Sequence, residues 1–339
     1  METIDQDPFQ PGNNLTLTID SDLQEVAYKA MGDQKGAVVI LDASNGEILV
    51  MVSTPSFDPN QLSLGLTQDE FNAFTRNKKK PLFNRAIAGQ YPPGSTIKPM
   101  IALGALEMGI VEPELYMPCE GKFLLPNYSR PFNDWATHGS VNVVRAIQAS
   151  CDVYFYQLAK WLGIRAIADN LAGFGFGQRT GIDLVDEPAG LLPTPEWKKK
   201  NRQESWFPGE TIITGIGQGY LLVTPLQLAY ATAVLANRGR IIRPRLLRGL
   251  EDPGSGVITN STQQFGLPLK SADPNYWSQI IQGMELVLHG PRGTARASGK
   301  NTPYQIAGKT GTAQIVGIPE DDSNIDELPE ELRDHALFI

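Results

Sequence analysis

Two nearly continuous apolar segments near the start of the chain constrain the fold most strongly. Residues 36–41 (Gly-Ala-Val-Val-Ile-Leu) and 47–52 (Glu-Ile-Leu-Val-Met-Val) are separated by five residues that end in Asn45-Gly46. Asn-Gly favours the tight turn of a β-hairpin, because both residues tolerate positive φ angles. Strands that lack polar alternation are usually buried on both faces. The segment therefore predicts a hairpin that other parts of the chain cover on both sides.

Helical patterns fill the middle of the chain, and strand-like patterns return at its end. Thr224-Pro-Leu-Gln227 has the residues of a helix start with a capping box, and the apolar pattern continues to Asn237. Residues 304–316 are strand-like, and residues 335–339 begin another apolar strand. We expect a mixed α/β (α+β) domain in which strands from both ends of the chain pair, and in which part of the C-terminal sheet is missing. The polar residues 1–14 are expected to form an N-terminal linker, and residues 15–339 one domain.

Composition excludes several classes of protein. The chain has 29 Lys and Arg against 37 Asp and Glu, a net charge of −8, and no basic stripe, so nucleic-acid binding is not expected. Two cysteines cannot form a disulfide framework. No apolar run approaches the roughly 20 residues that span a bilayer, and the polar residues after Met1 do not form a signal peptide. The sequence as it stands predicts a soluble piece.

A serine and a lysine lie three positions apart at the start of an apolar segment, in Ser95-Thr96-Ile97-Lys98. On a helix, such residues lie one turn apart on the same face, so the amine can reach the hydroxyl. A serine hydroxyl needs a base to become a nucleophile, and a buried lysine can be that base. The motif alone has little specificity, since a capped surface helix would look the same.

Two further motifs follow in an order that chance does not explain. Ser150-Cys151-Asp152 lies in an expected turn between two helical segments, where Ser150 and Asp152 could face a cleft. Lys309-Thr310-Gly311-Thr312 lies in the strand-like run and offers an amine and two hydroxyls to a carboxylate. The order Ser-x-x-Lys, Ser-x-Asp, Lys-Thr-Gly is typical of serine enzymes that react with penicillin.

On these motifs the chain resembles the transpeptidase domains of class B penicillin-binding proteins, in particular the elongation-specific members. The resemblance extends over nearly the whole chain from Pro11 to Ile339. It implies an active-site-serine penicillin-binding fold, in which a five-stranded antiparallel sheet is flanked by helices and by an all-helical part, with further C-terminal strands. It rests on residues 36–59, 91–99 (Tyr-Pro-Pro-Gly-Ser-Thr-Ile-Lys-Pro), 150–156, 180–184, 215–229 and 308–314.

The resemblance also implies roles for single residues. Ser95 would be the acylated nucleophile, Lys98 its general base, and Ser150 the group that passes a proton to the leaving amine. Lys309, Thr310 and Thr312, with Gly311 between them, would hold a substrate carboxylate. The backbone N–H groups of Ser95 and Thr312 would form the oxyanion hole.

The chain departs from the family pattern at Asp152, where the family often has asparagine. A carboxylate cannot donate the amide hydrogen bond that asparagine donates. Asp152 could instead pair with Lys98 and change its basicity.

The function implied by the resemblance is that of a peptidoglycan D,D-transpeptidase, which cross-links stem peptides in cell-wall elongation through a serine acyl-enzyme. Such an enzyme is a covalent target of β-lactams and needs no cofactor for its chemistry. The expected partners are a membrane glycosyltransferase and elongation-complex proteins, with the full-length protein anchored in the bacterial inner membrane and this domain in the periplasm. A β-lactamase or D,D-carboxypeptidase of the same fold, and a non-catalytic β-lactam sensor, remain alternatives.

Both cysteines of the chain occur in one irregular segment together with Asp134 and His138. Cys119, Asp134, His138 and Cys151 could complete a tetrahedral structural zinc site that braces the loop of Ser150. The spacing matches no standard zinc motif, and two buried cysteines with a surface histidine are the competing interpretation. The run Gly215-Ile-Gly-Gln-Gly219 follows no dinucleotide-binding unit, so tight packing beside the Thr224 helix is expected instead.

Overall fold

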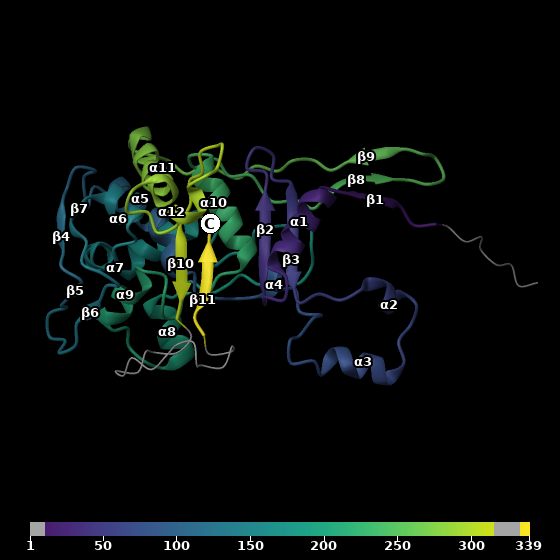
Figure 1. Cartoon of the computed structure of the whole chain (residues 1–339), viewed down its shortest axis with the longest axis horizontal. Helices are drawn as coiled ribbons and strands as arrows, with labels where there is room; N and C mark the ends of the chain where they lie inside the picture. Colours follow the sequence, from purple (N-terminus) through teal and green to yellow (C-terminus); the bar gives the residue numbers. More distant parts are fainter. Residues whose placement is uncertain (1–10, 315–332) are drawn as a thin grey trace, which may run out of the picture.

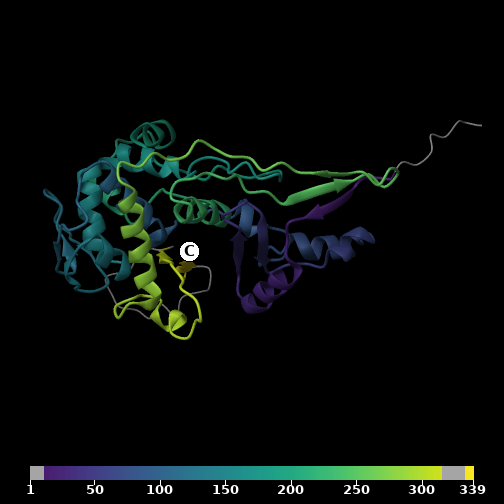
Figure 2. The same ribbon diagram turned by 90° about the horizontal axis from the view of Figure 1, so that it is seen from above.

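The computed structural model describes residues 11–314 and 333–339 of the chain. Most of the predicted linker, residues 1–10, and the last two residues of the expected strand 304–316 lie outside this part. Most helices gather on one side of the molecule, two antiparallel strand pairs lie beside them, and a thin arm of strands extends away from both (Figures 1 and 2). We therefore describe the strand pairs first and then the helices that position the candidate site.

The predicted hairpin is formed by β2 (Gly36–Leu41) and β3 (Ile48–Thr54), which pair antiparallel. On one face, Val50 packs with Ala27 of α1 (Ser21–Met31). On the other face, Met51 packs in a cluster with Leu226 of α10 (Pro225–Ala236). The prediction that the hairpin is covered on both sides is confirmed, although Ile40 at its edge remains 40% exposed.

The strand predicted near the end of the chain is present but short. It forms β10 (Thr310–Ala313) and pairs antiparallel with β11 (His335–Phe338), as the apolar residues 335–339 indicated. The pair lies beside the hairpin (Figures 1 and 2), but no hydrogen-bonded ladder connects the two pairs within the described residues. The expected five-stranded sheet is thus represented by four strands in two pairs.

The expected ladder between strands from both ends of the chain does not form within the described residues, but strands far apart in the sequence do pair in the arm. Strand β1 (Asn14–Leu17) pairs with β8 (Leu247–Glu251), and β8 also pairs with β9 (Ile258–Asn260). The predicted linker therefore ends in a strand, because Asn14 already belongs to β1.

The start of α10 confirms the capping box. The Gln227 backbone N–H donates to Thr224 Oγ1 at 3.1 Å, and Gln227 Oε1 accepts from the Thr224 backbone N–H at 2.9 Å. Pro225 occupies the first helical position, where its missing N–H costs nothing. This local signal places the helix correctly to within one residue at its end.

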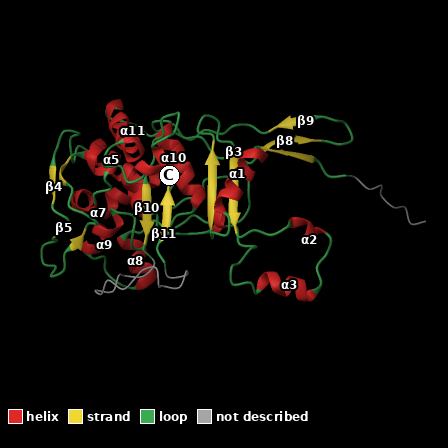
Figure 3. Ribbon diagram, in the orientation of Figure 1, coloured by secondary structure: helices red, strands yellow, loops and turns green. Residues whose placement is uncertain are grey.

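The helices form one apolar core around α5 (Lys98–Glu107), which is buried along most of its length. It packs against α7 (Asp152–Gly173) and α11 (Pro274–His289), and α11 also packs against α6 (Val143–Gln148) (Figure 3). A helix that is apolar all round needs neighbours on every side. The site residues at the start of α5 and α7 are therefore held by the best-packed part of the molecule.

No helix in the described ranges is both long and apolar enough to cross a membrane.

Shorter elements connect the strand pairs and the helical core. The short helices are α2 (Pro59–Ser63), α3 (Gln68–Thr75), α4 (Arg85–Ala88), α8 (Pro195–Arg202), α9 (Pro208–Thr214) and α12 (Arg296–Gly299), and the short strands are β4 (Met117–Cys119), β5 (Lys122–Phe123), β6 (Phe132–Asn133) and β7 (Gly139–Val141).

Candidate active site

Ser95 lies in a tight turn, the 3-10 segment η1 (Gly94–Ile97), which leads directly into α5. The turn begins with Gly94 at a φ of +53°, and the Gly94 N–H donates to the Gly217 carbonyl at 2.9 Å. Thr96 is buried and donates its hydroxyl to the Pro93 carbonyl at 2.7 Å. The turn is thus fixed from both sides, while the Ser95 side chain stays partly exposed.

Lys98, the first residue of α5, has no exposed side-chain surface. Its Nζ donates to Asp152 Oδ1 at 2.6 Å, to the Ser150 carbonyl at 2.8 Å and to Ser150 Oγ at 3.2 Å. The predicted pairing of Asp152 with Lys98 is therefore present. The spacing places Lys98 one turn after Ser95, but its amine is hydrogen-bonded to the Ser150 loop rather than to Ser95 Oγ.

Ser150 occupies the predicted turn between α6 and α7, with a φ of +54°. A residue with a side chain rarely adopts this conformation, and such backbone strain is common at functional sites. Its N–H donates to the Ile147 carbonyl at 3.2 Å, which closes the turn after α6. Asp152 is the first residue of α7. Ser150 and Asp152 line the cleft, whereas Cys151 between them is bonded to Cys119.

Lys309 reaches the same point from the strand side. Its Nζ donates to Ser150 Oγ at 2.8 Å and to the Thr310 carbonyl at 2.7 Å, and its side chain has no exposed surface. Burial, together with the positive charge of Lys98, holds the pKa of Lys309 well below its ordinary value, and the negative charge of Asp152 opposes this shift. Two lysine amines therefore meet at one serine hydroxyl.

A cleft of about 1080 Å³ opens above these groups. Its wall includes Ser95, Ser150 and Asp152, and Lys98 and Lys309 lie buried beneath them. The structure brings all five predicted catalytic residues together, and the predicted carboxylate-binding residues Thr310, Gly311 and Thr312 line the same cleft.

Sequence reasoning missed several other polar or aromatic residues of the cleft, and three of them are Gln218, Thr294 and Trp135. Gln218 donates its side-chain amide to the Thr312 carbonyl at 2.8 Å, and Thr294 Oγ1 lies 2.7 Å from Thr310 Oγ1. Trp135 lines the cleft with an indole that is 65% exposed. None of these residues belongs to a motif, although Gln218 lies inside the glycine run that was noted. The apolar end of the cleft is formed by Phe132, Tyr156, Ile213 and Ile216.

The glycine run has the packing role that was expected, but against a different neighbour. A Cβ atom added to Gly217 would lie 2.1 Å from the Gly94 carbonyl oxygen, and one added to Gly94 would lie 2.4 Å from the Thr312 carbonyl oxygen. Gly217, in the middle of the run, therefore packs against the turn that carries Ser95. Only residues without side chains allow three backbone segments to approach so closely.

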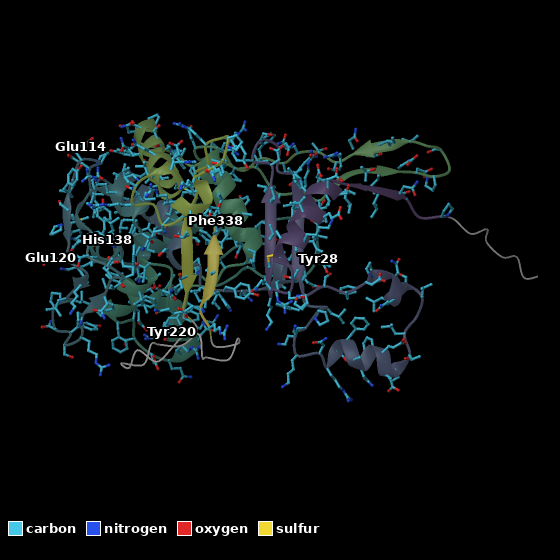
Figure 4. All side chains as sticks on the ribbon, viewed as in Figure 1. Tyr28, Glu114, Glu120, His138, Tyr220 and Phe338 are labelled. Carbon is cyan, nitrogen blue, oxygen red and sulfur yellow. A yellow bond between two sulfur atoms is a disulfide. The ribbon has the colours of Figure 1, made fainter. Side chains whose placement is uncertain are left out.

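The four residues of the predicted zinc site come together, but two of them are bonded to each other. Their ligand atoms lie within 4.8 Å of one another, and His138 Nε2 lies 3.2 Å from Asp134 Oδ1. Cys119 and Cys151, however, form a disulfide. A disulfide offers no thiolate to a metal, so this structure does not support the zinc prediction. His138 lies on the helical side of the molecule, away from the hairpin (Figure 4).

Comparison with known proteins gives one consistent family. The sequence model described as "Penicillin binding protein transpeptidase domain" matches residues 36–327. A curated relative from Acinetobacter baumannii, "Peptidoglycan D,D-transpeptidase MrdA", is 43% identical over 338 residues, which cover 98% of this chain and 49% of the relative. The chain therefore spans about half the length of that relative.

Solved structures agree with this result. A structure of Pseudomonas aeruginosa PBP2 in complex with WCK 5153 superimposes with a TM-score of 0.87 at 41% identity, covering 97% of this chain and 68% of that one. PBP2 in a complex with MreC from Helicobacter pylori gives a TM-score of 0.84 at 32% identity, covering 96% and 56%. Together with the geometry of Ser95, Ser150 and Lys309, these matches show that the chain belongs to the penicillin-binding protein transpeptidase family.

Proposed function

We propose that the protein is a peptidoglycan D,D-transpeptidase that cross-links stem peptides in cell-wall elongation through an ester on Ser95. The single observation that carries this proposal is the meeting of Lys98 and Lys309 at Ser150 Oγ, beside Ser95 in one cleft. The relatives that cover nearly all of this chain are named for the same activity.

In the first step, Ser95 Oγ attacks the carbonyl carbon of a D-Ala-D-Ala bond while its proton passes to the amine of Lys98, which must first release to solvent the proton that it holds in the ion pair with Asp152. The N–H groups of Ser95 and Thr312 stabilise the negative oxygen that forms; loss of one such donor costs about 3–4 kcal/mol. Ser150 passes a proton to the nitrogen of the leaving D-alanine. The C–N bond breaks, and an ester remains on Ser95.

In the second step, an amine of another stem peptide attacks the ester. A C–N bond forms, the bond to Ser95 Oγ breaks, and the proton released by the amine returns to Ser95 Oγ through Ser150. Lys309, Thr310 and Thr312 act in the first step, where they hold the carboxylate of the D-alanine that leaves. Asp152 acts through Lys98, because its 2.6 Å ion pair keeps the amine next to Ser150.

Intact-mass spectrometry after incubation with benzylpenicillin tests the proposal. We expect one adduct per chain on Ser95, stable for hours, and none on a Ser95→Ala variant that remains folded. An adduct on Ser150 would contradict the assignment of the nucleophile. Loss of the adduct within seconds would favour a β-lactamase. A stable adduct without transfer from a peptide donor to an amine would favour a sensor.

The partners and the location follow the relatives. We propose that the full-length protein is held at the bacterial inner membrane with this domain in the periplasm, and that it works with a glycosyltransferase and with elongation-complex proteins. The Helicobacter pylori PBP2 that resembles this chain was solved in a complex with MreC. Co-purification of the full-length protein with tagged candidates tests this part, and recovery of none would contradict it.

We propose separately that Cys119, Asp134, His138 and Cys151 bind one structural zinc when the two cysteines are reduced. Two thiolates, a carboxylate and an imidazole are the donors that zinc prefers, and four protein ligands leave no open position for chemistry. Thiol titration and elemental analysis of protein purified without chelator distinguish the two states. One equivalent of zinc supports the proposal, and less than about a tenth of an equivalent, with no reactive thiols, leaves the disulfide.

A further inference from the structure

A second cavity of about 570 Å³ adjoins the active-site cleft, and no motif or proposed catalytic role accounts for it. Trp135 lines both cavities. Two pairs of consecutive residues also join the two spaces. Ala149 lines the second cavity and the next residue, Ser150, lines the cleft; likewise Gly293 lines the second cavity and Thr294 lines the cleft. The second cavity is therefore a continuation of the cleft past Ser150 and Thr294.

The indole that separates the two spaces is exposed but fixed. Trp135 Nε1 donates to the Ala149 carbonyl at 3.2 Å, and its ring contacts the His138 ring edge-on at a centroid distance of 4.9 Å. Exposed aromatic rings held in place by such contacts are common where a protein binds a peptide, because little conformational entropy is lost on binding.

Arg292 supplies the charge of the second cavity. It is exposed, and no carboxylate within residues 11–314 or 333–339 pairs with it. Guanidinium groups bind carboxylates through paired hydrogen bonds. Arg292 is therefore available to pair with the carboxylate of a ligand that occupies this cavity.

The position of the cavity assigns it to one of the two substrates. Thr294 touches Thr310, which holds the carboxylate of the leaving residue in the proposed reaction. The leaving amine departs at this end of the cleft. By microscopic reversibility, the amine that attacks the ester arrives where the first amine departed. The remainder of that second peptide must then extend past Thr294 and Ser150.

We propose that the second cavity binds the acceptor, an acidic peptide with a free amine, and that Arg292 pairs with a carboxylate of this peptide while Trp135 covers its apolar part. The inference rests on the proposed transpeptidase function. In the step it serves, the acceptor N–C bond forms, the ester bond to Ser95 Oγ breaks, and one amine proton ends on Ser95 Oγ. Arg292 binds the acceptor without touching the reacting atoms.

The test compares transfer from an N-acyl-D-alanyl thioester to two acceptor peptides, which carry the same side-chain amine and differ only in one glutamate or glutamine. In the whole chain, Arg292→Glu should raise the half-saturating concentration of the glutamate peptide about tenfold, the loss expected for one charge-assisted hydrogen bond. The same variant should leave unchanged both the half-saturating concentration of the glutamine peptide and the rate of acylation by benzylpenicillin. Arg296→Glu, an exposed change outside both cavities, should alter nothing.

Each other outcome overturns the inference in a recognisable way. If Arg292→Glu raised the half-saturating concentrations of both peptides equally, the charge of the peptide would not be recognised. If it raised neither, the acceptor would not reach Arg292. Slower acylation by benzylpenicillin would place Arg292 in the donor site. If the unaltered protein transferred the acyl group only to water and never to a peptide amine, the proposal of an acceptor site would be wrong. Absence of any Ser95 ester in the unaltered protein would instead refute the proposed function.

Discussion

Replacing Lys309 by methionine tests whether the proposed substrate-binding amine destabilises the folded protein. The Lys309 side chain is fully buried, and its pKa is held well below the ordinary value, first by burial and then by the charge of Lys98. The protonated amine therefore costs folding free energy that an apolar side chain of similar length does not cost. We expect Lys309→Met to be more stable than the unaltered protein and to bind carboxylate ligands poorly.

The size of the gain follows from two opposing terms. Replacing buried ionic groups by apolar ones of similar volume stabilises proteins by about 1–4 kcal/mol. The two hydrogen bonds of Lys309 are lost, at about 1 kcal/mol each, but Ser150 Oγ still accepts from Lys98. At the upper end of that range, subtracting about 2 kcal/mol for the two hydrogen bonds leaves a net gain of about 1–2 kcal/mol, which corresponds to a Tm increase of about 1–3 °C for a domain of this size.

The pH dependence distinguishes this cause from better packing alone. Because the folded pKa of Lys309 lies below the unfolded one, the unfolded chain binds more protons between the two values, and stability of the unaltered protein rises with pH across that interval. The cost of Lys309 is complete below the folded pKa and disappears near the unfolded value of about 10.4. The advantage of the methionine variant should therefore shrink as the pH approaches about 10.

Thermal unfolding monitored by circular dichroism at several pH values measures this difference. Lys300→Met provides the matched control, because Lys300 is exposed and its replacement should change Tm little at any pH. A lower Tm for Lys309→Met at neutral pH would refute the reasoning. An advantage that stays constant up to about pH 10 would refute the electrostatic cause.

Three further changes have expected outcomes. Lys98→Ala should slow acylation by benzylpenicillin about 10²–10⁴-fold, as loss of a positioned base does, and an unchanged rate in stopped-flow measurements would exclude that role. Gly217→Ala places a Cβ 2.1 Å from the backbone of the nucleophile turn and should slow acylation at least about tenfold through misplacement of Ser95. Gly256 has a similar positive φ but open space around it, so the control variant Gly256→Ala should not slow acylation. Glu47→Ala removes the shared partner of Arg245 and Arg248, which are partly exposed, and should lower the unfolding free energy in urea by about 1–3 kcal/mol.

Local signals in the sequence were sufficient where a few neighbouring residues determine the structure. The Asn45-Gly46 turn and the Thr224 capping box are such cases, and both elements formed where they were predicted. The turn at Ser150 was also predicted from the helical patterns on either side. In each case the decisive contacts lie within a few residues along the chain, so their free energies depend little on the rest of the fold.

Contacts between distant segments could not be predicted in the same way. The partner of the glycine run was mistaken, because nothing near Gly217 indicates that Gly94 lies against it. Trp135 lies in the loop between β6 and β7 and Thr294 in the loop between α11 and α12, and the position of each loop depends on the packing of distant elements. The sequence does not distinguish the two states of Cys119 and Cys151 for a related reason, since a thiolate pair at a metal and a disulfide need nearly the same approach of two side chains.

The charges at Ser150 show why the site is arranged as it is. Two buried amines, Lys98 and Lys309, meet at one hydroxyl, and Asp152 is ion-paired with Lys98. Burial lowers the pKa of Lys309, and the positive charge of Lys98 lowers it further, because the one carboxylate of Asp152 does not offset both effects. A ligand carboxylate beside Lys309 would supply the missing negative charge and favour protonation of its amine. Binding and protonation would then be coupled, so that the second positive charge forms chiefly when a substrate is present to pair with it.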